Sequence, residues 1–447
     1  MRTLLLTYSH PFIKAFFFLY VLLVIVQDLP TQLSIGTIAR SPYVLLSPLV
    51  FVLILLESSR LFSVKVVNVY VTYFIYSLII SVAWLIYYIG FKQLGSTAYD
   101  ENLVVKFFKA SMYNFIIILT LYNFIYIFKR HSSNFILLLL RSILWCQLIV
   151  GFIQFISPEA LRSLKTPELN PVDRLSLLNS EPSLAFPQLF ISFLCFAAFK
   201  LFLKSKFTIG DMLLGVATIA LLLAIQSRGG IVLAVICLLA IILTTKQKLE
   251  RKLIVLVVAS VAVIPMVYVI VEVIIPGLVL DIQEFNSVST RSITILSSLV
   301  SLFQYPLGQG YSTYLITFPP ILTSTMNWVL NTVELPLLTS EIDEMIVTGR
   351  ALTVKSGLLN EVLYSGWSVI IFYFAFFKEA FRKLGAASES KGLLVAFRLI
   401  FIFIIINFLF VSTWETSYII PLSFALLEKV YFEVFRSREL SSAQLEQ

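Results

Sequence analysis

The chain has 447 residues, of which 59% are hydrophobic and only 13% carry a formal charge. Together with a mean hydropathy of +0.94, this composition excludes an ordinary soluble domain and is typical of a polytopic membrane protein. The chain has only three cysteines, all in apolar stretches, and two histidines. We therefore expect no disulfide framework, no metal site and no cofactor.

Apolar segments long enough to form membrane helices recur along almost the whole chain. A bilayer core of roughly 30 Å takes about 20 helical residues, and the segments lack the two-residue alternation of an outer-membrane barrel. The sequence therefore predicts an all-α polytopic membrane protein with about twelve transmembrane helices. The first segment is interpreted as an anchor and not as a signal peptide, because no small-residue cleavage site follows it. We place the helices at residues 12–27, 43–56, 66–90, 108–128, 134–157, 184–203, 209–226, 230–245, 253–275, 357–377, 393–412 and 417–434.

The distribution of charge predicts the orientation of these helices. If the N-terminus is cytoplasmic, the cytoplasmic turns, termini and helix ends hold about two thirds of the 33 Lys and Arg residues and only about one third of the 25 acidic residues. By the positive-inside rule, both termini then lie in the cytoplasm. The net charge of +8 thus reflects topology and does not indicate binding of nucleic acid.

This topology divides the chain into four regions and makes its two faces unequal. The cytoplasmic turns are short and contain no Gly-Lys-Ser phosphate loop, whereas the outer face carries one very long connection. We therefore expect the functional groups on the outer face. The regions are 1–157 with the first five helices, 158–275 with helices six to nine, 276–356 as the large outer loop, and 357–447 with the last three helices and a cytoplasmic tail.

A short polar segment, Arg174-Leu-Ser-Leu-Leu-Asn-Ser-Glu181-Pro182-Ser183, precedes the sixth predicted helix. Ser180 or Glu181 suits a helix cap and Pro182 suits the first helical position, where the helix dipole also favours an acidic residue. A helix start is enough to explain these residues. The functional alternative is that the arginine and the carboxylate act together at the edge of the membrane.

A second segment, Ser-Arg228-Gly229-Gly230, separates two apolar runs that are too long to form one helix. The two glycines permit a sharp reversal, which would hold Arg228 at the outer membrane boundary. The arginine then either snorkels at a helical hairpin or grips a phosphate group through two hydrogen bonds. Arg141 and Arg398, nearer the cytoplasm, are expected to snorkel or to pair with neighbouring helices.

The long outer loop opens with an amphipathic helix that carries Arg291 and ends in the turn Pro306-Leu-Gly308-Gln-Gly310. This turn is too short to be a nucleotide-binding fingerprint. The loop is also rich in aromatic residues, which would either stack on a sugar or form a belt at the membrane interface. These aromatic residues are Tyr311, Tyr314, Phe318 and Trp328.

In this order and on one face, the three elements resemble the O-antigen polymerase and ligase superfamily, which comprises the Wzy-type polymerases and their ligase relatives. In that family an Arg and Glu-Pro-Ser element precedes one span, a Ser-Arg-Gly hairpin follows two spans later, and a large periplasmic loop opens with an arginine helix that ends in Pro-x-Gly-x-Gly. The resemblance covers roughly residues 170–370. It implies a GT-C-like glycosyltransferase of the bacterial inner membrane, acting on its periplasmic face without metal or nucleotide.

The resemblance also implies partners and site residues. The donor and the acceptor would both be undecaprenyl-pyrophosphate-linked oligosaccharides, and a chain-length regulator protein would be a further partner beside the lipid bilayer. Arg174, Arg228 and Arg291 match the arginines of the family motifs and would bind the pyrophosphate. Glu181 matches the acidic residue and is our first candidate for the general base.

Three further candidates come from their position in the chain. Arg350 and Lys355 lie at the end of the large loop, where they could also bind the pyrophosphate. Glu361 lies within the tenth predicted helix near the same face. It is the second candidate for the general base, because ionisable residues within membrane helices are usually functional.

One departure from the family pattern favours one of its branches. The ligases carry a His-Asn pair about eleven residues before the glycine that opens the span after the large loop, and counting back from Gly366 gives Lys355 and Ser356. No histidine lies on the predicted outer face, so a polymerase is preferred over a ligase. A flippase for lipid-linked oligosaccharides is the alternative from another class, but it should have two similar halves and short loops on both faces.

Overall fold

A computed structural model describes the arrangement of most of the chain. Arg174 and the ninth predicted helix at 253–275 lie outside the described residues. The structure describes residues 11–29, 41–57, 63–99, 101–157, 175–179, 181–225, 227–244, 286–332, 338–349, 352–354, 356–387, 391–410 and 419–445.

Helices make up nearly all of the described residues, as predicted, with one two-stranded hairpin. Its antiparallel register pairs Thr97 with Asn102 and Ala98 with Glu101. In chain order the elements are α1 (Pro11–Leu22), η1 (Leu23–Ile25), α3 (Pro42–Glu57), α4 (Lys65–Leu85), η3 (Ile86–Phe91), β1 (Thr97–Ala98), β2 (Glu101–Asn102), α5 (Leu103–Arg130), α6 (Ser133–Ile156), α7 (Pro182–Phe202), α8 (Ile209–Ala224), α9 (Arg228–Thr244), α12 (Asn286–Gln304), α13 (Tyr314–Thr332), α14 (Ser340–Thr348), α15 (Gly357–Ser365), α16 (Ser368–Ala387), α17 (Lys391–Phe410) and α18 (Ile420–Leu445).

Five of the described helices are long and apolar enough to cross a membrane. Three shorter apolar helices, at Pro11–Ile25, Pro42–Leu56 and Ile209–Ala224, accompany them, and all eight lie where the sequence predicted membrane helices. The five long ones are Lys65–Phe91, Leu103–Arg130, Ser133–Ile156, Pro182–Phe202 and Gly392–Leu409.

Polar side chains fix where several of these helices begin. Asn102 precedes α5, and its side-chain oxygen accepts hydrogen bonds from the backbone N–H groups of Val104 and Val105, at 3.0 and 3.1 Å. Thr208 and Asp211 form a capping box at the start of α8. Each cap satisfies backbone donors that the first helical turn would otherwise leave without an acceptor.

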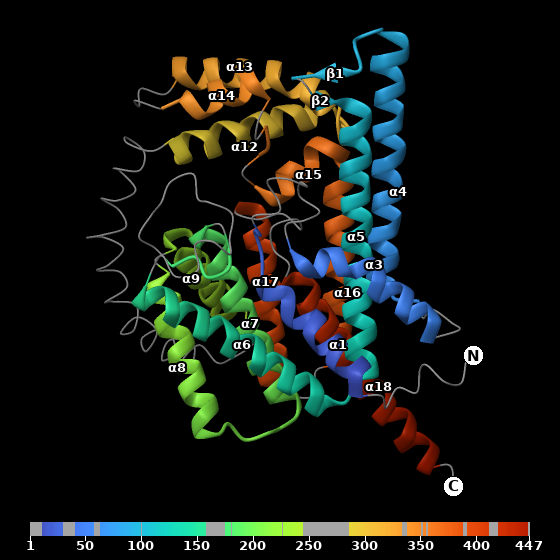
Figure 1. The fold of residues 1–447 in the computed structure, drawn as a ribbon, viewed down its shortest axis with the longest axis vertical. Coiled ribbons are helices and arrows are strands. Elements are labelled where there is room, and N and C mark those ends of the chain that lie inside the picture. The colour runs from blue at the N-terminus through green and yellow to red at the C-terminus, as the bar shows by residue number, and fades with distance from the viewer. Residues whose placement is uncertain are drawn as a thin grey trace.

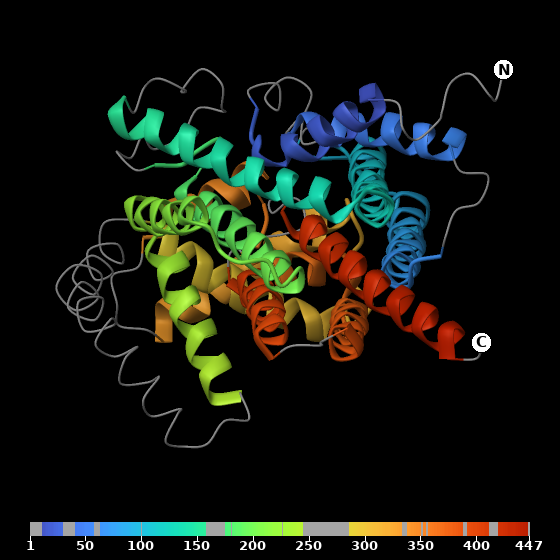
Figure 2. The same ribbon diagram turned by 90° about the horizontal axis from the view of Figure 1, so that it is seen from below.

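The helices form a lengthwise bundle that is capped at one end (Figure 1). Helices α4, α5, α16 and α17 run along the long axis, and α12, α13 and α14 lie across one end, next to the hairpin of β1 and β2. Helix α18 leaves the bundle at the other end, as the view from that end also shows (Figure 2). We call the end that carries α12–α14 the capped end. The described part of the predicted outer loop is therefore a helical layer over this end.

One prediction for the last third of the chain is wrong. The apolar run at 357–377 was expected to be a single membrane helix, but it is divided into α15 and α16 at Gly366. The backbone of Gly366 has φ +58 and ψ −139, a conformation that is essentially restricted to glycine. The chain therefore turns sharply there, and α15 is a short helix that lies beneath the layer of α12, α13 and α14, which we call the cap (Figure 1).

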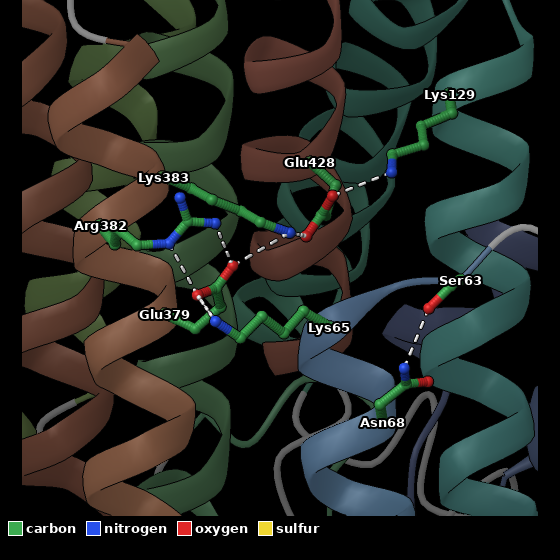
Figure 3. Close-up of polar contacts among 8 residues, drawn as sticks. All are labelled: Ser63, Lys65, Asn68, Lys129, Glu379, Arg382, Lys383 and Glu428. Carbon is green, nitrogen blue, oxygen red and sulfur yellow. Dashed lines mark hydrogen bonds and ion pairs between the residues drawn. The ribbon is translucent and has the colours of Figure 1, made fainter.

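At the other end, buried ion pairs tie four helices together (Figure 3). Glu428 of α18 forms ion pairs with Lys129 of α5, at 3.0 Å, and with Lys383 of α16. Glu379 of α16, one helical turn from Lys383, pairs with Arg382 and with Lys65 of α4. Both carboxylates are almost fully buried, so each requires these cations to stay charged.

A second buried ion pair joins three further helices. Asp211 of α8 pairs with Lys200 of α7 and, at 2.8 Å, with Arg141 of α6. Lys200 is as deeply buried as its partner, and its ammonium group also donates a hydrogen bond to the backbone oxygen of Lys206 at 3.0 Å. Of the two interpretations of Arg141, pairing with a neighbouring helix is thus the one that is confirmed.

Candidate functional site

Four of the predicted site residues cannot be placed as side chains. Arg174, Arg350 and Lys355 lie outside the described residues, and so does the side chain of Arg228, whose backbone begins α9. The roles assigned to these residues stay predictions.

The predicted break between two helices lies just before Arg228, because α8 ends at Ala224 and α9 begins at Arg228. The two glycines therefore lie in the first turn of α9 and not in the connection. Neither glycine is among the described residues with positive φ. Gly230 is instead a packing residue, because a Cβ atom there would lie 2.5 Å from the ring of Phe186 in α7.

Glu181 marks a helix start, as one of the two interpretations held. It is the N-cap of α7, with Pro182 in the first helical position. Its carboxylate is exposed and accepts a hydrogen bond from the hydroxyl of Ser183 at 2.9 Å, but it does not cap the helix with its own side chain. The environment of Glu181 is therefore that of a solvated surface carboxylate.

Arg291 and Glu361 lie on two helices that pack against each other. Arg291 is half-buried in α12, and the neighbouring Thr290 donates a hydrogen bond to the carboxylate of Glu341 in α14 at 2.8 Å. Farther along α12, the hydroxyl of Ser298 donates to the backbone oxygen of Leu359 in α15 at 2.9 Å. The capped end thus brings these two predicted residues onto adjoining elements.

Glu361 occupies the interior of the protein, directly beneath the cap. Its side chain is 3% exposed, and its Oε2 atom accepts a hydrogen bond from the hydroxyl of Tyr73 at 2.8 Å. Tyr73 lies well inside Lys65–Phe91, one of the helices long enough to cross a membrane. A carboxylic acid at such depth is costly to keep and is often retained for chemistry.

Both ends of α15 are fixed, which fixes the position of Glu361. At its start, Ser356 is the N-cap, and its hydroxyl also donates to the backbone oxygen of Leu409 in α17 at 2.6 Å. At its other end, the turn after α12 meets the last residues of α15 backbone to backbone. The three hydrogen bonds of this contact run from Gln309 N to Leu363 O at 2.7 Å, from Gly310 N to Tyr364 O at 3.0 Å and from Trp367 N to Pro306 O at 2.9 Å.

This contact explains the Pro-x-Gly-x-Gly pattern. Gly308 and Gly310 both have positive φ, +91 and +77, and a Cβ atom on Gly308 would lie 2.4 Å from the backbone oxygen of Tyr364. The same turn is held on α4, because the indole of Trp84 donates to the backbone oxygen of Gly308 at 2.7 Å. The turn formed by this motif therefore packs against the C-terminal end of α15 and holds the helix of Glu361 in place; we call it the seat of α15.

Further hydroxyl groups of α4 face this seat. The hydroxyls of Ser77 and Ser365 are 2.7 Å apart, and Ser81 accepts a hydrogen bond from the backbone N–H of Tyr311 at 2.9 Å. Together with Tyr73 these serines recur every fourth residue and mark one polar stripe on an otherwise apolar helix. The spacing was visible in the sequence, but it was missed because the first five helices were treated as merely hydrophobic.

The aromatic residues of the predicted outer loop are mostly inside the cap. Tyr311, Tyr314 and Phe318 are at most 4% exposed, and only Trp328 is largely exposed. Three of the four side chains are thus core residues, so they form neither a stacking surface for sugars nor an interface belt.

The arrangement offers a buried carboxyl group with a phenol as its hydrogen-bond partner. Such a pair can accept or return a proton once a reactant reaches it. A surface hollow of about 460 Å³ lies elsewhere on the cap, lined in part by Tyr99, Pro319 and Ile346, and none of its lining residues belongs to α4 or α15. Within the described ranges, no three His, Cys, Asp or Glu side chains form a group that could hold a metal ion.

Comparison with known proteins assigns no family to the chain. The chain matches no protein-family model, no curated protein and no solved structure.

Proposed function

We propose that the protein is a polysaccharide polymerase that joins undecaprenyl-pyrophosphate-linked oligosaccharide repeat units. The proposal places about twelve membrane helices in a GT-C-like arrangement in the bacterial inner membrane, with both termini in the cytoplasm and the capped end in the periplasm. The observation that carries it is the buried Glu361 beneath that end, on a helix seated by the Pro-x-Gly-x-Gly turn. A chain-length regulator protein is part of the proposal as a partner.

The proposed reaction is a glycosyl transfer with a pyrophosphate leaving group. A sugar hydroxyl of one lipid-linked unit attacks the anomeric carbon of the growing chain, a new C–O bond forms, and the bond from that carbon to the pyrophosphate oxygen breaks. The hydroxyl proton passes to a carboxylate, and undecaprenyl pyrophosphate leaves with its charge balanced by arginines. Arg174, Arg228 and Arg291 are assigned to the pyrophosphate, with Arg350 and Lys355 in support.

Of the two candidates for the base, we now favour Glu361. Glu181 is exposed and accepts a hydrogen bond from the hydroxyl of its neighbour Ser183. Glu361 is buried and already accepts a hydrogen bond from a phenolic hydroxyl, and a hydroxyl held in this way is the kind of group from which a general base takes a proton. The choice follows from these two environments alone.

The direct test uses the purified protein in nanodiscs with a defined undecaprenyl-pyrophosphate-linked repeat unit. We expect a ladder of longer lipid-linked products without any nucleotide sugar. Glu361→Gln should remove most of the lengthening, whereas Glu181→Gln and the exposed control Glu101→Gln should retain it. If no ladder forms with the wild type, a polymerase is ruled out. If only Glu181→Gln is inactive, the base assignment is wrong.

Two experiments in cells distinguish a polymerase from a flippase and from a ligase. A strain that lacks the gene should still carry single repeat units on lipid A if the protein polymerises, and none if it is a flippase. The protein should also fail to restore full-length lipopolysaccharide in a ligase-deficient strain. Restoration there would assign it to the ligase branch.

The orientation is tested by cysteine labelling. Val347 on α14 and Lys204 after α7 are both exposed. A membrane-impermeant maleimide added outside the inner membrane should modify Val347→Cys and should leave Lys204→Cys unmodified. The reverse pattern would place the capped end in the cytoplasm and would remove the proposed reaction.

A further inference from the structure

Helix α12 exposes its apolar side and buries its polar side. In soluble proteins the apolar side of a surface helix faces the core, but the exposed side of α12 is mostly apolar, with Phe303 75% exposed. Its buried side is mostly hydroxylic. The exposed apolar residues are Leu296, Leu299, Val300 and Phe303, and the buried hydroxyl residues are Ser289, Thr290, Thr294, Ser297, Ser298 and Ser301.

Aromatic residues with polar tips gather where α12 ends. Trp84 near the top of α4 stacks on Tyr88 with ring centroids 5.5 Å apart, and it meets the edge of Tyr305, the residue after α12, at 5.8 Å. Phe303 meets Trp367 at the start of α16 at 6.2 Å. Trp and Tyr are enriched at the level where hydrocarbon gives way to lipid headgroups.

The exposed apolar side of α12 continues onto the lengthwise helices. Beyond Trp367, the outer side of α16 presents Ile371 and Phe374, which are 69% and 68% exposed. Across the aromatic group, α4 presents Ile79 at 62%, and the following η3 presents Ile86 at 55%. Helix α4 belongs to a segment that is long and apolar enough to cross a membrane, so its exposed apolar side is expected to face lipid. The strip of exposed apolar residues on α12, Leu296, Leu299, Val300 and Phe303, continues that surface.

We infer that α12 lies in the surface of the lipid bilayer, with Leu296, Leu299, Val300 and Phe303 among the acyl chains and its hydroxyl side against α15. The occupant of this face is phospholipid, because the strip is continuous with the lipid-facing side of α4 and because aromatic residues mark the interface at its end. The inference does not depend on the proposed reaction.

The position of α12 also gives the depth of Glu361. Tyr73, which donates a hydrogen bond to Glu361, lies eleven residues before Trp84, about 16 Å deeper along α4 at 1.5 Å per residue. The hydroxyl of Ser298 on α12 bonds to Leu359, two residues before Glu361. Helix α12 thus contacts the helix of Glu361 two residues from that carboxyl group, and the carboxyl group lies below the interface that Trp84 marks.

The test measures which solvent surrounds α12. In a background with Cys146, Cys195 and Cys237 replaced by alanine, single cysteines are introduced by Leu299→Cys and Phe303→Cys and labelled with bimane in nanodiscs of phosphatidylcholine and phosphatidylglycerol. Two controls are Ile79→Cys on α4 and Val347→Cys on α14, which is 75% exposed. Fluorescence is quenched either by phospholipids with brominated acyl chains or by iodide in the water.

We expect positions 299 and 303 to behave like position 79, with quenching of at least half of the fluorescence by brominated lipid and little by iodide. Position 347 should show the opposite. The inference is overturned if positions 299 and 303 follow position 347, since α12 would then lie in water. It is equally overturned if both positions resist both quenchers, since protein would then cover them. Elution of each variant at the wild-type volume in size-exclusion chromatography shows that it has folded.

Discussion

Replacing Gly366 by alanine should loosen the helix that carries Glu361. The glycine has φ +58 and ψ −139, and an alanine forced into such a conformation is strained by about 1 to 3 kcal/mol. Its Cβ atom would also lie 2.1 Å from the backbone oxygen of Pro306. Since two backbones cannot yield as a flexible side chain can, the turn and the helix must separate.

The cost of that separation follows from the contacts that are lost. Three backbone hydrogen bonds join the turn to the end of α15, and each contributes about 1 kcal/mol. With the strain, the end of α15 should lose roughly 4 to 6 kcal/mol of local stability. Amide hydrogen exchange should therefore speed up by roughly a thousandfold or more over Gly357–Ser365, and the activity that depends on Glu361 should fall with it.

A matched substitution serves as the control for this experiment. Gly385 is exposed in α16, and a Cβ atom there would meet nothing within 4 Å. Gly385→Ala should leave exchange in α15 unchanged and stabilise α16 by up to about 1 kcal/mol. If Gly366→Ala exchanges in α15 at the wild-type rate, the turn is not the seat of this helix.

Three further predictions concern other parts of the chain. Glu428→Gln should destabilise the protein by about 3 to 5 kcal/mol in thermal unfolding because it removes the buried carboxylate that compensates the charges of Lys129 and Lys383, against less than about 1 kcal/mol for the exposed control Glu101→Gln; equal losses would contradict this. Tyr73→Phe should lower turnover and shift the pH profile of turnover while thermal stability stays unchanged. An unshifted profile would mean that the Tyr73 hydroxyl takes no part in the reaction. Burial and neighbouring cations lower the pKa of His131 to about 4, so stability should fall by up to about 1.4 kcal/mol per pH unit from about 6.5 toward 4. His131→Phe should abolish that slope.

The sign of the last effect comes from proton binding. The unfolded chain takes up a proton on His131 near pH 6.5, whereas the folded chain does so only near pH 4. Between these values the unfolded state binds more protons, so acid favours it. Above pH 6.5 neither state is protonated and the full contribution is present.

Three of the four lengthwise helices, α4, α5 and α17, could be predicted from the sequence because their signal is local. An apolar run ends where a charged or capping residue appears, so Lys65 marks the first residue of α4 and Arg130 the last residue of α5. The start of α7 at Pro182 was predicted for the same reason, since the residues that fix a cap lie within one turn of it.

The division of 357–377 could not be predicted from local patterns. Gly366 turns where it does because Pro306 and Gly308 lie against it, and these residues are about sixty positions earlier in the chain. Periodicity carries no information about such a contact. The burial of Tyr311 and Phe318 was missed for the same reason, because an aromatic residue in a polar loop gives no sign of whether another helix will cover it.

Two buried carboxylates, one at each end of the bundle, allow a role in stability to be distinguished from a role in the reaction. Glu428 has two ammonium groups for partners, on α5 and α16, so its charge is neutralised and its removal should act on stability. Glu361 accepts a hydrogen bond from a neutral phenol on α4, and glutamine can accept the same bond with nearly the same shape. Glu361→Gln should therefore unfold within a few degrees of the wild type while turnover is lost, and Glu428→Gln should unfold well below it while the protein that remains folded keeps its turnover. If Glu361→Gln instead unfolds as early as Glu428→Gln, Glu361 holds the cap together and the proton acceptor lies elsewhere.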